Sequence, residues 1–311
     1  MDIESLKNFE IVGSIYENRN LWPSFKDYSE ANSDEIDAMI IFVGDYAFEH
    51  QGRSPDFAHM AKDVLRESKQ QYSLTEAINA GKVWQEFRDK IINLSPGRVS
   101  DSDRQKNTRA AANVNPLAPH ATEYEFKRKN PVGVVTSRPQ KTRDNSLSII
   151  EFMTQLDRKN IVDWTIKRLK NNLTKDAHGA LTTINGIGDK IASLWLRDVA
   201  YRFDCIPSEN EELLFPVDIW VRRVAAALLA GEKEYIEDND PVIAKLLTRK
   251  CIDLGLSPEK INMGIWYMGA QIARSKYMMK KALQDTNLFQ RLVRDHLMGM
   301  KRAVEFANPA I

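Results

Sequence analysis

Hydrophobic residues recur at helical spacing along most of this chain. Between Asp34 and His50, the side chains of Ile36, Met39 and Val43 fall on one stripe, and Asp34 is of a type that often caps helices. The same spacing predicts further helices over Asp56–Lys69, Leu74–Ile92, Ser148–Leu156, Ile161–Asn171, Asp176–Ile184, Lys190–Phe203, Ile219–Ala230, Val242–Leu254, Ser257–Lys281 and Asn287–Phe306. The pattern therefore predicts an all-α protein.

The periodicity is lost between Leu94 and Asn145. This stretch holds five prolines, and its ten basic residues outnumber five acidic ones. Such a segment is either a basic arm that reaches phosphates or a solvated linker, and a short strand could form over Val132–Thr136. We therefore divide the chain into an N-terminal helical region (1–94), a Pro-rich basic connection (95–145) and a C-terminal helical domain (146–311).

Composition narrows the class of protein without fixing its function. The formal net charge is only +1, so any affinity for a polyanion must come from local features. Cys205 and Cys251 are the two cysteines, and neither belongs to a cluster that would hold zinc or iron–sulfur, so we expect two buried thiols and no metal. We expect no membrane-spanning segment and no secretion signal, which favours a cytoplasmic or nuclear protein.

The most informative stretch is LTTINGIGDKIA, from Leu181 to Ala192. Gly186 and Gly188 predict a turn too tight for side chains, placed between two amphipathic helices. The first backbone amides of the second helix lack intrahelical partners and lie at its positive dipole end, an arrangement that binds phosphate. This stretch resembles the helix-hairpin-helix motif, in which Asn185, Gly186, Ile187, Gly188 and Lys190 would contact a DNA phosphate.

A second stretch, FPVDIWVRRV from Phe215 to Val224, makes the resemblance more specific. It is similar to the segment in which DNA glycosylases of the helix-hairpin-helix superfamily carry an essential aspartate, here Asp218. The resemblance implies a two-lobed helical glycosylase fold with the helix-hairpin-helix motif between the lobes. One departure is the connection Asp204–Leu214, which is longer than usual and leaves open how Asp218 lies relative to Lys190.

The resemblance also implies the chemistry. Lys190 stands where bifunctional members carry a nucleophilic lysine that forms a Schiff base with the sugar. Asp218 would stabilise the positive charge that builds on the sugar as the base leaves. Each residue also has an ordinary structural explanation, because lysine is a common phosphate contact in hairpins and aspartate is a favoured N-cap.

A third resemblance concerns INMGIWYMGAQ, from Ile261 to Gln271. It is similar to the late helix that lines the base pocket in 8-oxoguanine glycosylases, and makes Gly264, Trp266 and Met268 pocket candidates. Glycine inside a helix costs about 1 kcal/mol relative to alanine, so Gly264 and Gly269 indicate close approach of either a ligand or another backbone. A tightly packed core helix is the alternative.

These observations lead to one functional hypothesis with two alternatives. The hypothesis is a DNA repair glycosylase with AP lyase activity, which excises a damaged base, such as 8-oxoguanine, from double-stranded DNA. The alternatives are a monofunctional glycosylase and a non-catalytic helix-hairpin-helix DNA-binding protein. We expect no cofactor. A monovalent cation could bind at the hairpin, and the sequence indicates no protein partner.

Overall fold

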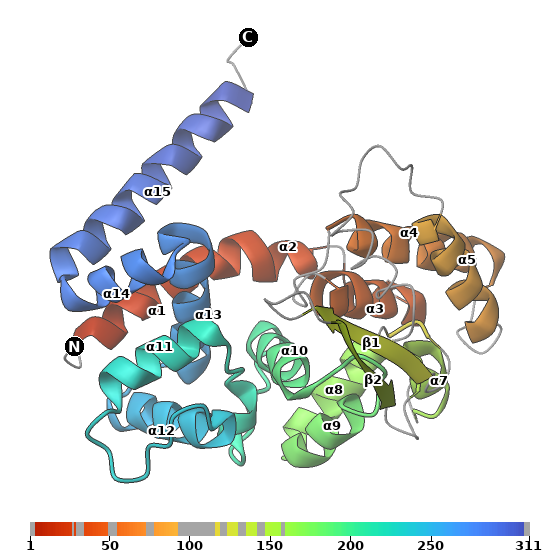
Figure 1. Ribbon diagram of the computed structural model, residues 1–311, viewed down its shortest axis with the longest axis horizontal. Helices are drawn as coiled ribbons and strands as arrows, with labels where there is room; N and C mark the ends of the chain where they lie inside the picture. The colour runs from red at the N-terminus through yellow and green to blue at the C-terminus, as the bar shows by residue number, and fades with distance from the viewer. Residues whose placement is uncertain are drawn as a thin grey trace. The chain divides into compact units, whose positions relative to one another are not determined.

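The computed structural model describes residues 4–26, 28, 34–48, 55–72, 78–92, 116–118, 123–129, 135–141, 147–156 and 159–307. The described chain is mostly helical, as the hydrophobic periodicity predicts (Figure 1). One pair of antiparallel strands departs from that pattern: β1 (Glu123–Lys129) pairs with β2 (Val135–Lys141). Both strands lie in the predicted connection. The strand expected over Val132–Thr136 overlaps β2 at its last two residues, and the first three lie outside the described residues.

The chain forms two compact units. One consists of Met1–Pro23 together with Asn210–Ile311, and we call it the terminal unit; the other is Ser24–Glu209, the central unit. The terminal unit thus joins the first residues of the chain to its last hundred, whereas the sequence analysis divided the chain into consecutive segments.

The central unit contains most of the predicted helices before Phe203. Its helical elements are α3 (Glu35–Ile41), which continues as the π-helical segment η2 (Phe42–Phe48), α4 (Pro55–Gln71), α5 (Ala80–Ile92), α7 (Ile149–Thr154), α8 (Ile161–Lys170), α9 (Thr174–Leu181) and α10 (Asp189–Arg202). Capping explains two of the helix starts, because Asp34 and Ser148 each form a reciprocal capping box with an acidic residue three positions later.

The core of the central unit is built around α10. The fully buried ring of Trp195 meets the edges of the Phe42 and Tyr46 rings, each with its centroid 5.0 Å away, and its Nε1 donates to Thr165 Oγ1 at 2.9 Å. One turn further along α10, the buried carboxylate of Asp198 accepts a hydrogen bond from the hydroxyl of Tyr46 at 3.0 Å. These contacts fix α10, and with it the turn at its N-terminus.

The terminal unit contains the remaining elements. These are α1 (Glu4–Tyr16), η1 (Glu17–Leu21), α2 (Trp22–Ser24) at the boundary, η5 (Glu211–Leu214), α11 (Ile219–Leu228), α12 (Asp240–Asp253), α13 (Pro258–Tyr267), η6 (Met268–Ala273), α14 (Lys276–Gln284) and α15 (Thr286–Ala307). Figure 1 shows α1 beside α13, and α15 extending beyond the rest of this unit. Of the helices in the described residues, none is both long and apolar enough to cross a membrane.

The packing of α1 against α13 depends on two glycines. A Cβ at Gly264 would collide with the carbonyl oxygen of Phe9, and one at Gly13 would collide with the carbonyl oxygen of Lys260. The two helix backbones are therefore in direct contact at these positions. The sequence analysis did not predict α1.

Two predicted boundaries are wrong. The single helix expected over Ser257–Lys281 is interrupted because Arg274 adopts a left-handed conformation (φ 54°) and Ser275 then caps α14 by accepting from the amide of Met278. The helix expected from Leu74 begins instead at Ala80, as α5. Its start is fixed because the side chain of Asn79 accepts a hydrogen bond from a backbone amide in the first turn of α5.

Candidate functional site

The stretch with the two glycines forms a tight turn between α9 and α10. Gly186 has φ 76°, in the left-handed region that favours glycine. The amide of Ile187 donates to the carbonyl of Ile184 at 3.0 Å and closes the turn. The isoleucines at 184, 187 and 191 are all buried.

A bridge to the start of α7 anchors this turn. The amide of Leu147 donates to the carbonyl of Thr183 at 2.9 Å, and the amide of Asn185 donates to the carbonyl of Leu147 at 2.8 Å. Asn185 is also buried. Its backbone N–H is therefore engaged within the protein, and so is that of Ile187, although both residues were predicted to contact phosphate.

The start of α10 presents the remaining amides. Gly188 is the N-cap residue, makes no side-chain cap and is exposed. Within the part of the chain that the structure describes, the backbone N–H groups of Gly188 and Asp189 donate no hydrogen bond. An exposed helix start with two such amides is suited to bind an anion.

Lys190 is the second residue of α10 and is half-buried. The preceding Asp189 is exposed, and its carbonyl oxygen lies 3.3 Å from the Nε2 of His178 on α9. The candidate nucleophile thus lies beside the two amides of the helix start.

Asp218 caps the start of α11, as the sequence analysis expected. Its Oδ1 accepts from the amides of Trp220 at 2.8 Å and Val221 at 3.0 Å. Its Oδ2 accepts no hydrogen bond from the described residues, and the side chain is only half-buried. The segment before it is held in place, because the buried Asn262 of α13 donates to the carbonyl of Pro216 at 3.0 Å.

Two residues that the sequence analysis did not include among the site residues reinforce the first turn of α11. The indole of Trp220 lies against Gly269, where a Cβ would collide with it, and the guanidinium of Arg223 lies 4.4 Å from the centroid of the Trp220 ring. The spacing of three residues along the helix, together with Gly269, is the signal that could have identified this stack.

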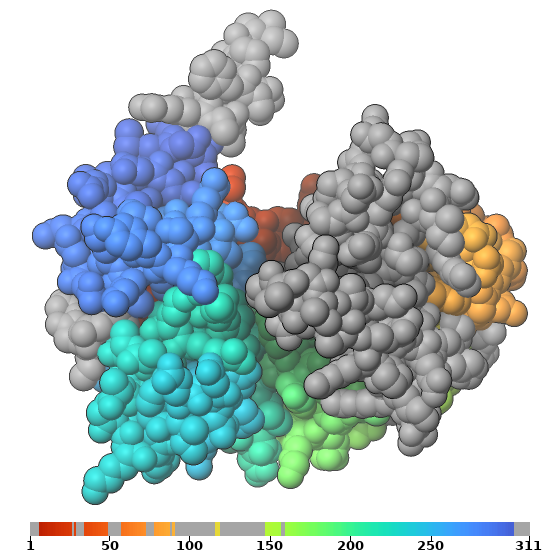
Figure 2. All heavy atoms as spheres, viewed as in Figure 1, coloured from red at the N-terminus to blue at the C-terminus, as the bar shows by residue number. Residues whose placement is uncertain are grey.

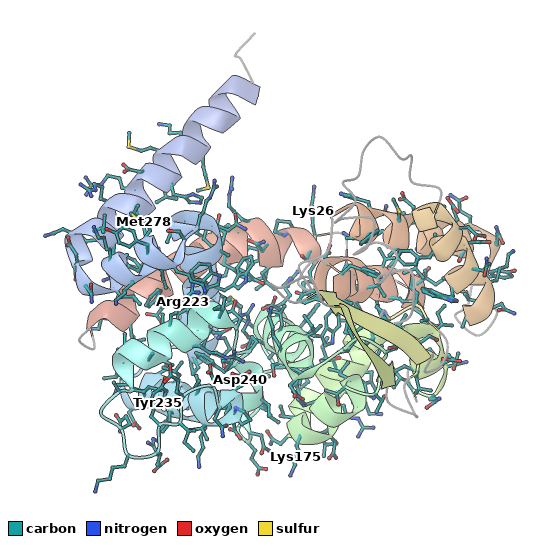
Figure 3. The ribbon with its side chains drawn as sticks, viewed as in Figure 1. Lys26, Lys175, Arg223, Tyr235, Asp240 and Met278 are labelled. Carbon is teal, nitrogen blue, oxygen red and sulfur yellow. The ribbon has the colours of Figure 1, made fainter. Side chains whose placement is uncertain are left out.

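The neighbouring arginine has a different role. Arg222 forms a two-pronged ion pair with Asp240, with both N–O distances at 2.8 Å. Arg223 and Asp240 are labelled in Figure 3. Nη1 of Arg223 is buried and finds no hydrogen-bond partner among the described residues.

Packing within the terminal unit accounts for the three pocket candidates. Gly264 lies against the backbone of α1, Met268 is fully buried, and the half-buried Trp266 meets the ring of Tyr16 edge-on with centroids 5.8 Å apart. A base-binding role for these residues stays a prediction. Their packing supports the alternative of a tightly packed helix.

The predicted site residues fall in both units. The turn and Lys190 belong to the central unit, whereas Asp218 and the three pocket candidates belong to the terminal unit. Within the terminal unit, α11 packs on α13, so Asp218 and the pocket candidates are carried by neighbouring helices.

The two thiols take no part in this arrangement. Cys205 and Cys251 are both buried and unpaired. Burial raises the pKa of the Cys205 thiol to about 11 and that of Cys251 to about 12, so neither is a ready nucleophile or metal ligand at neutral pH. Among the residues described, no group of three or more His, Cys, Asp or Glu side chains could hold a metal ion.

Comparison with known proteins gives no further guide to the site. Neither a protein-family model, nor a curated protein, nor a solved structure matches this chain.

Proposed function

We propose that this protein is a DNA glycosylase with AP lyase activity, which removes a damaged base from double-stranded DNA. The observation that carries the proposal is the start of α10: an exposed, uncapped helix terminus with two amides available to an anion, directly followed by Lys190. The fold we propose is the two-lobed helical glycosylase fold, with α9, the turn and α10 as its helix-hairpin-helix motif.

DNA binding would begin at this helix start. The amides of Gly188 and Asp189 would donate to a backbone phosphate, and the helix dipole would favour the negative charge. Gly186 supports this role because its left-handed conformation, which glycine adopts without strain, forms the tight turn directly before Gly188. The predicted contacts through the amides of Asn185 and Ile187 are not part of the proposal, because both amides donate within the protein.

The reaction would begin once the damaged nucleotide is extruded from the duplex, which costs a few kcal/mol. The neutral Nζ of Lys190 attacks C1′ of the sugar, and the bond between C1′ and the base breaks. The base leaves with the bonding electron pair and takes up a proton. Opening of the sugar ring gives a Schiff base, and loss of a C2′ proton then expels the 3′ phosphate by β-elimination.

Asp218 would stabilise this reaction electrostatically. The sugar gains positive charge as the base departs, and a fixed carboxylate nearby lowers the energy of that state. The cap bonds at Oδ1 fix the carboxylate, while Oδ2 accepts no bond from the described residues. In a cell, such an enzyme would act where the DNA is, on the cytoplasmic nucleoid or in a nucleus.

Borohydride trapping tests the proposal. The protein is incubated with duplexes that each carry one lesion, starting with 8-oxoguanine, and reduced; we expect a covalent adduct that Lys190→Gln abolishes. Lys175→Gln is the matched control, because Lys175 is an exposed lysine on α9 of the same unit (Figure 3) and the adduct should persist. Base release without an adduct would instead indicate a monofunctional glycosylase. Binding without base release from any duplex would indicate a non-catalytic DNA-binding protein.

A further inference from the structure

Positive charge is concentrated near the end of the described chain. Between Arg274 and Lys301 there are seven basic and two acidic residues, whereas the whole chain has 44 basic and 43 acidic ones. This segment comprises α14 and the greater part of α15, which pack against each other and form the blue surface of the terminal unit in Figure 2.

Six basic side chains on and directly before these helices are exposed to solvent. We define the α14–α15 basic surface as the exposed residues Arg274, Lys276, Lys280, Lys281, Arg291 and Arg294. Among the described residues, no carboxylate lies within 4.0 Å of the charged nitrogen atoms of any of these six.

The other side of the same unit is different. On α11 and α12, Arg222 pairs with Asp240 at 2.8 Å, Arg249 with Glu234 at 3.5 Å and Lys250 with Glu232 at 3.1 Å. Three positive charges there are therefore compensated locally. None of the six on the α14–α15 basic surface is paired with a carboxylate of the described residues, so the field of this surface extends into solvent and attracts anions.

The form of this surface suits a polyanion better than a membrane. The apolar residues Met279 and Ala282 of α14 are buried in the unit, so neither is available to insert into lipid. Its solvent side carries Lys276 and Lys280 one turn apart, and beside them the ammonium of Lys281 lies 4.6 Å from the centroid of the exposed Tyr277 ring.

We infer that the α14–α15 basic surface binds the phosphate backbone of duplex DNA, in addition to the contact made by the start of α10. The inference rests on the proposed function, which supplies DNA as the polyanion. Binding would release condensed counterions, so each phosphate contact adds about 0.9 to the slope of log affinity against log salt concentration. This surface would hold undamaged duplex without regard to sequence.

Salt-dependent binding of an undamaged duplex tests the inference. Affinity is measured by fluorescence anisotropy between about 50 and 200 mM salt for the full chain and for K276Q/K280Q/K281Q. If all three lysines contact phosphates, the loss of affinity over this range should be about 40-fold smaller in the triple variant than in the wild type. R291Q/R294Q tests α15 separately, and circular dichroism confirms folding.

The control is K233Q/K245Q/R249Q, which removes three positive charges from exposed residues on and before α12 of the same unit. It should keep the salt dependence of the wild type. A triple α14 variant that behaves like this control would overturn the inference while leaving the proposed function intact. A wild type that binds no DNA at low salt would overturn both.

Discussion

In the proposed function, Asp218 combines a structural and a chemical role in one side chain. Its Oδ1 satisfies two amides at the start of α11, which is enough to explain an aspartate at this position. Its second oxygen accepts no hydrogen bond from the described residues, and the proposed chemistry uses this oxygen. The two roles can be separated, because asparagine also caps helices well but carries no charge.

We therefore expect Asp218→Asn to keep the fold and lose the reaction. The midpoint of thermal unfolding should change little, while the single-turnover rate of base release should fall by about 100-fold or more, the usual effect of removing an electrostatic group from an active site. Asp34→Asn, at the N-cap of α3, is the matched control and should leave the rate unchanged. Base release by Asp218→Asn at the wild-type rate would exclude Asp218 from the reaction.

Gly264 is explained by packing at the residue scale. Alanine there would gain about 1 kcal/mol of helix propensity but would force the backbones of α1 and α13 apart. We expect Gly264→Ala to lower the free energy of unfolding by about 2 kcal/mol, measured by urea denaturation. Gly299→Ala on α15, where a Cβ would meet nothing within 4 Å, should instead be neutral or slightly stabilising. Equal effects at both positions would contradict the close contact.

At the scale of elements, the turn between α9 and α10 depends on the left-handed backbone of Gly186. Alanine in this conformation costs about 1 to 2 kcal/mol. We expect Gly186→Ala to lower stability by this amount and also to weaken binding of duplex DNA in an anisotropy titration. Gly255→Ala, at the other described glycine with positive φ (66°), should cost similar stability with unchanged DNA binding. Unchanged DNA binding in both variants would argue against the turn as a contact.

The packing of α15 should depend on pH. His296 on α15 lies with its Nε2 3.2 Å from the hydroxyl oxygen of Tyr267, and burial, together with Arg19 and Arg274, lowers the pKa of His296 below 6.5. In the unfolded chain, His296 binds a proton more readily than in the folded protein. The contribution of neutral His296 to the free energy of unfolding is therefore fully present above pH 6.5 and is lost as pH falls through the lower pKa of the folded state.

We expect the wild type to lose more stability than His296→Gln between about pH 7 and pH 5, measured by urea denaturation at each pH. Equal losses of stability in the two proteins would show that the protonation of His296 does not affect the packing of α15.

At the scale of the whole molecule, the two units differ in how they are made from the chain. The central unit is one continuous stretch, whereas the terminal unit needs α1 from the beginning of the chain to cover α13. Its fold is therefore completed by a segment about two hundred residues distant in sequence.

Fragments should reflect this difference. We expect residues 24–209 to unfold cooperatively as an isolated fragment, followed by circular dichroism. Residues 210–311 should do so only after a peptide of residues 1–23 is added, because the face of α13 that carries Gly264 is otherwise exposed to water. A cooperative transition of 210–311 alone, unaffected by the peptide, would contradict the role of α1.

The sequence determined the local features of this protein. Helical spacing and capping residues such as Asp34 and Asp218 located most helices, because these signals act between residues three or four positions apart. The turn at Gly186 and the capping position of Asp218 were predictable for the same reason.

Only the tertiary structure decided features that depend on distant partners. Gly264 indicated a close approach from the sequence alone. Only the packed structure shows that the approaching group is the backbone of α1. The interruption at Arg274, the engaged amide of Asn185 and the uncompensated charge of the α14–α15 basic surface likewise depend on which groups the fold brings within reach. Local hydrogen bonds form between residues a few positions apart, so short sequence patterns predict them. Packing and ion pairing depend on residues that are neighbours only in space.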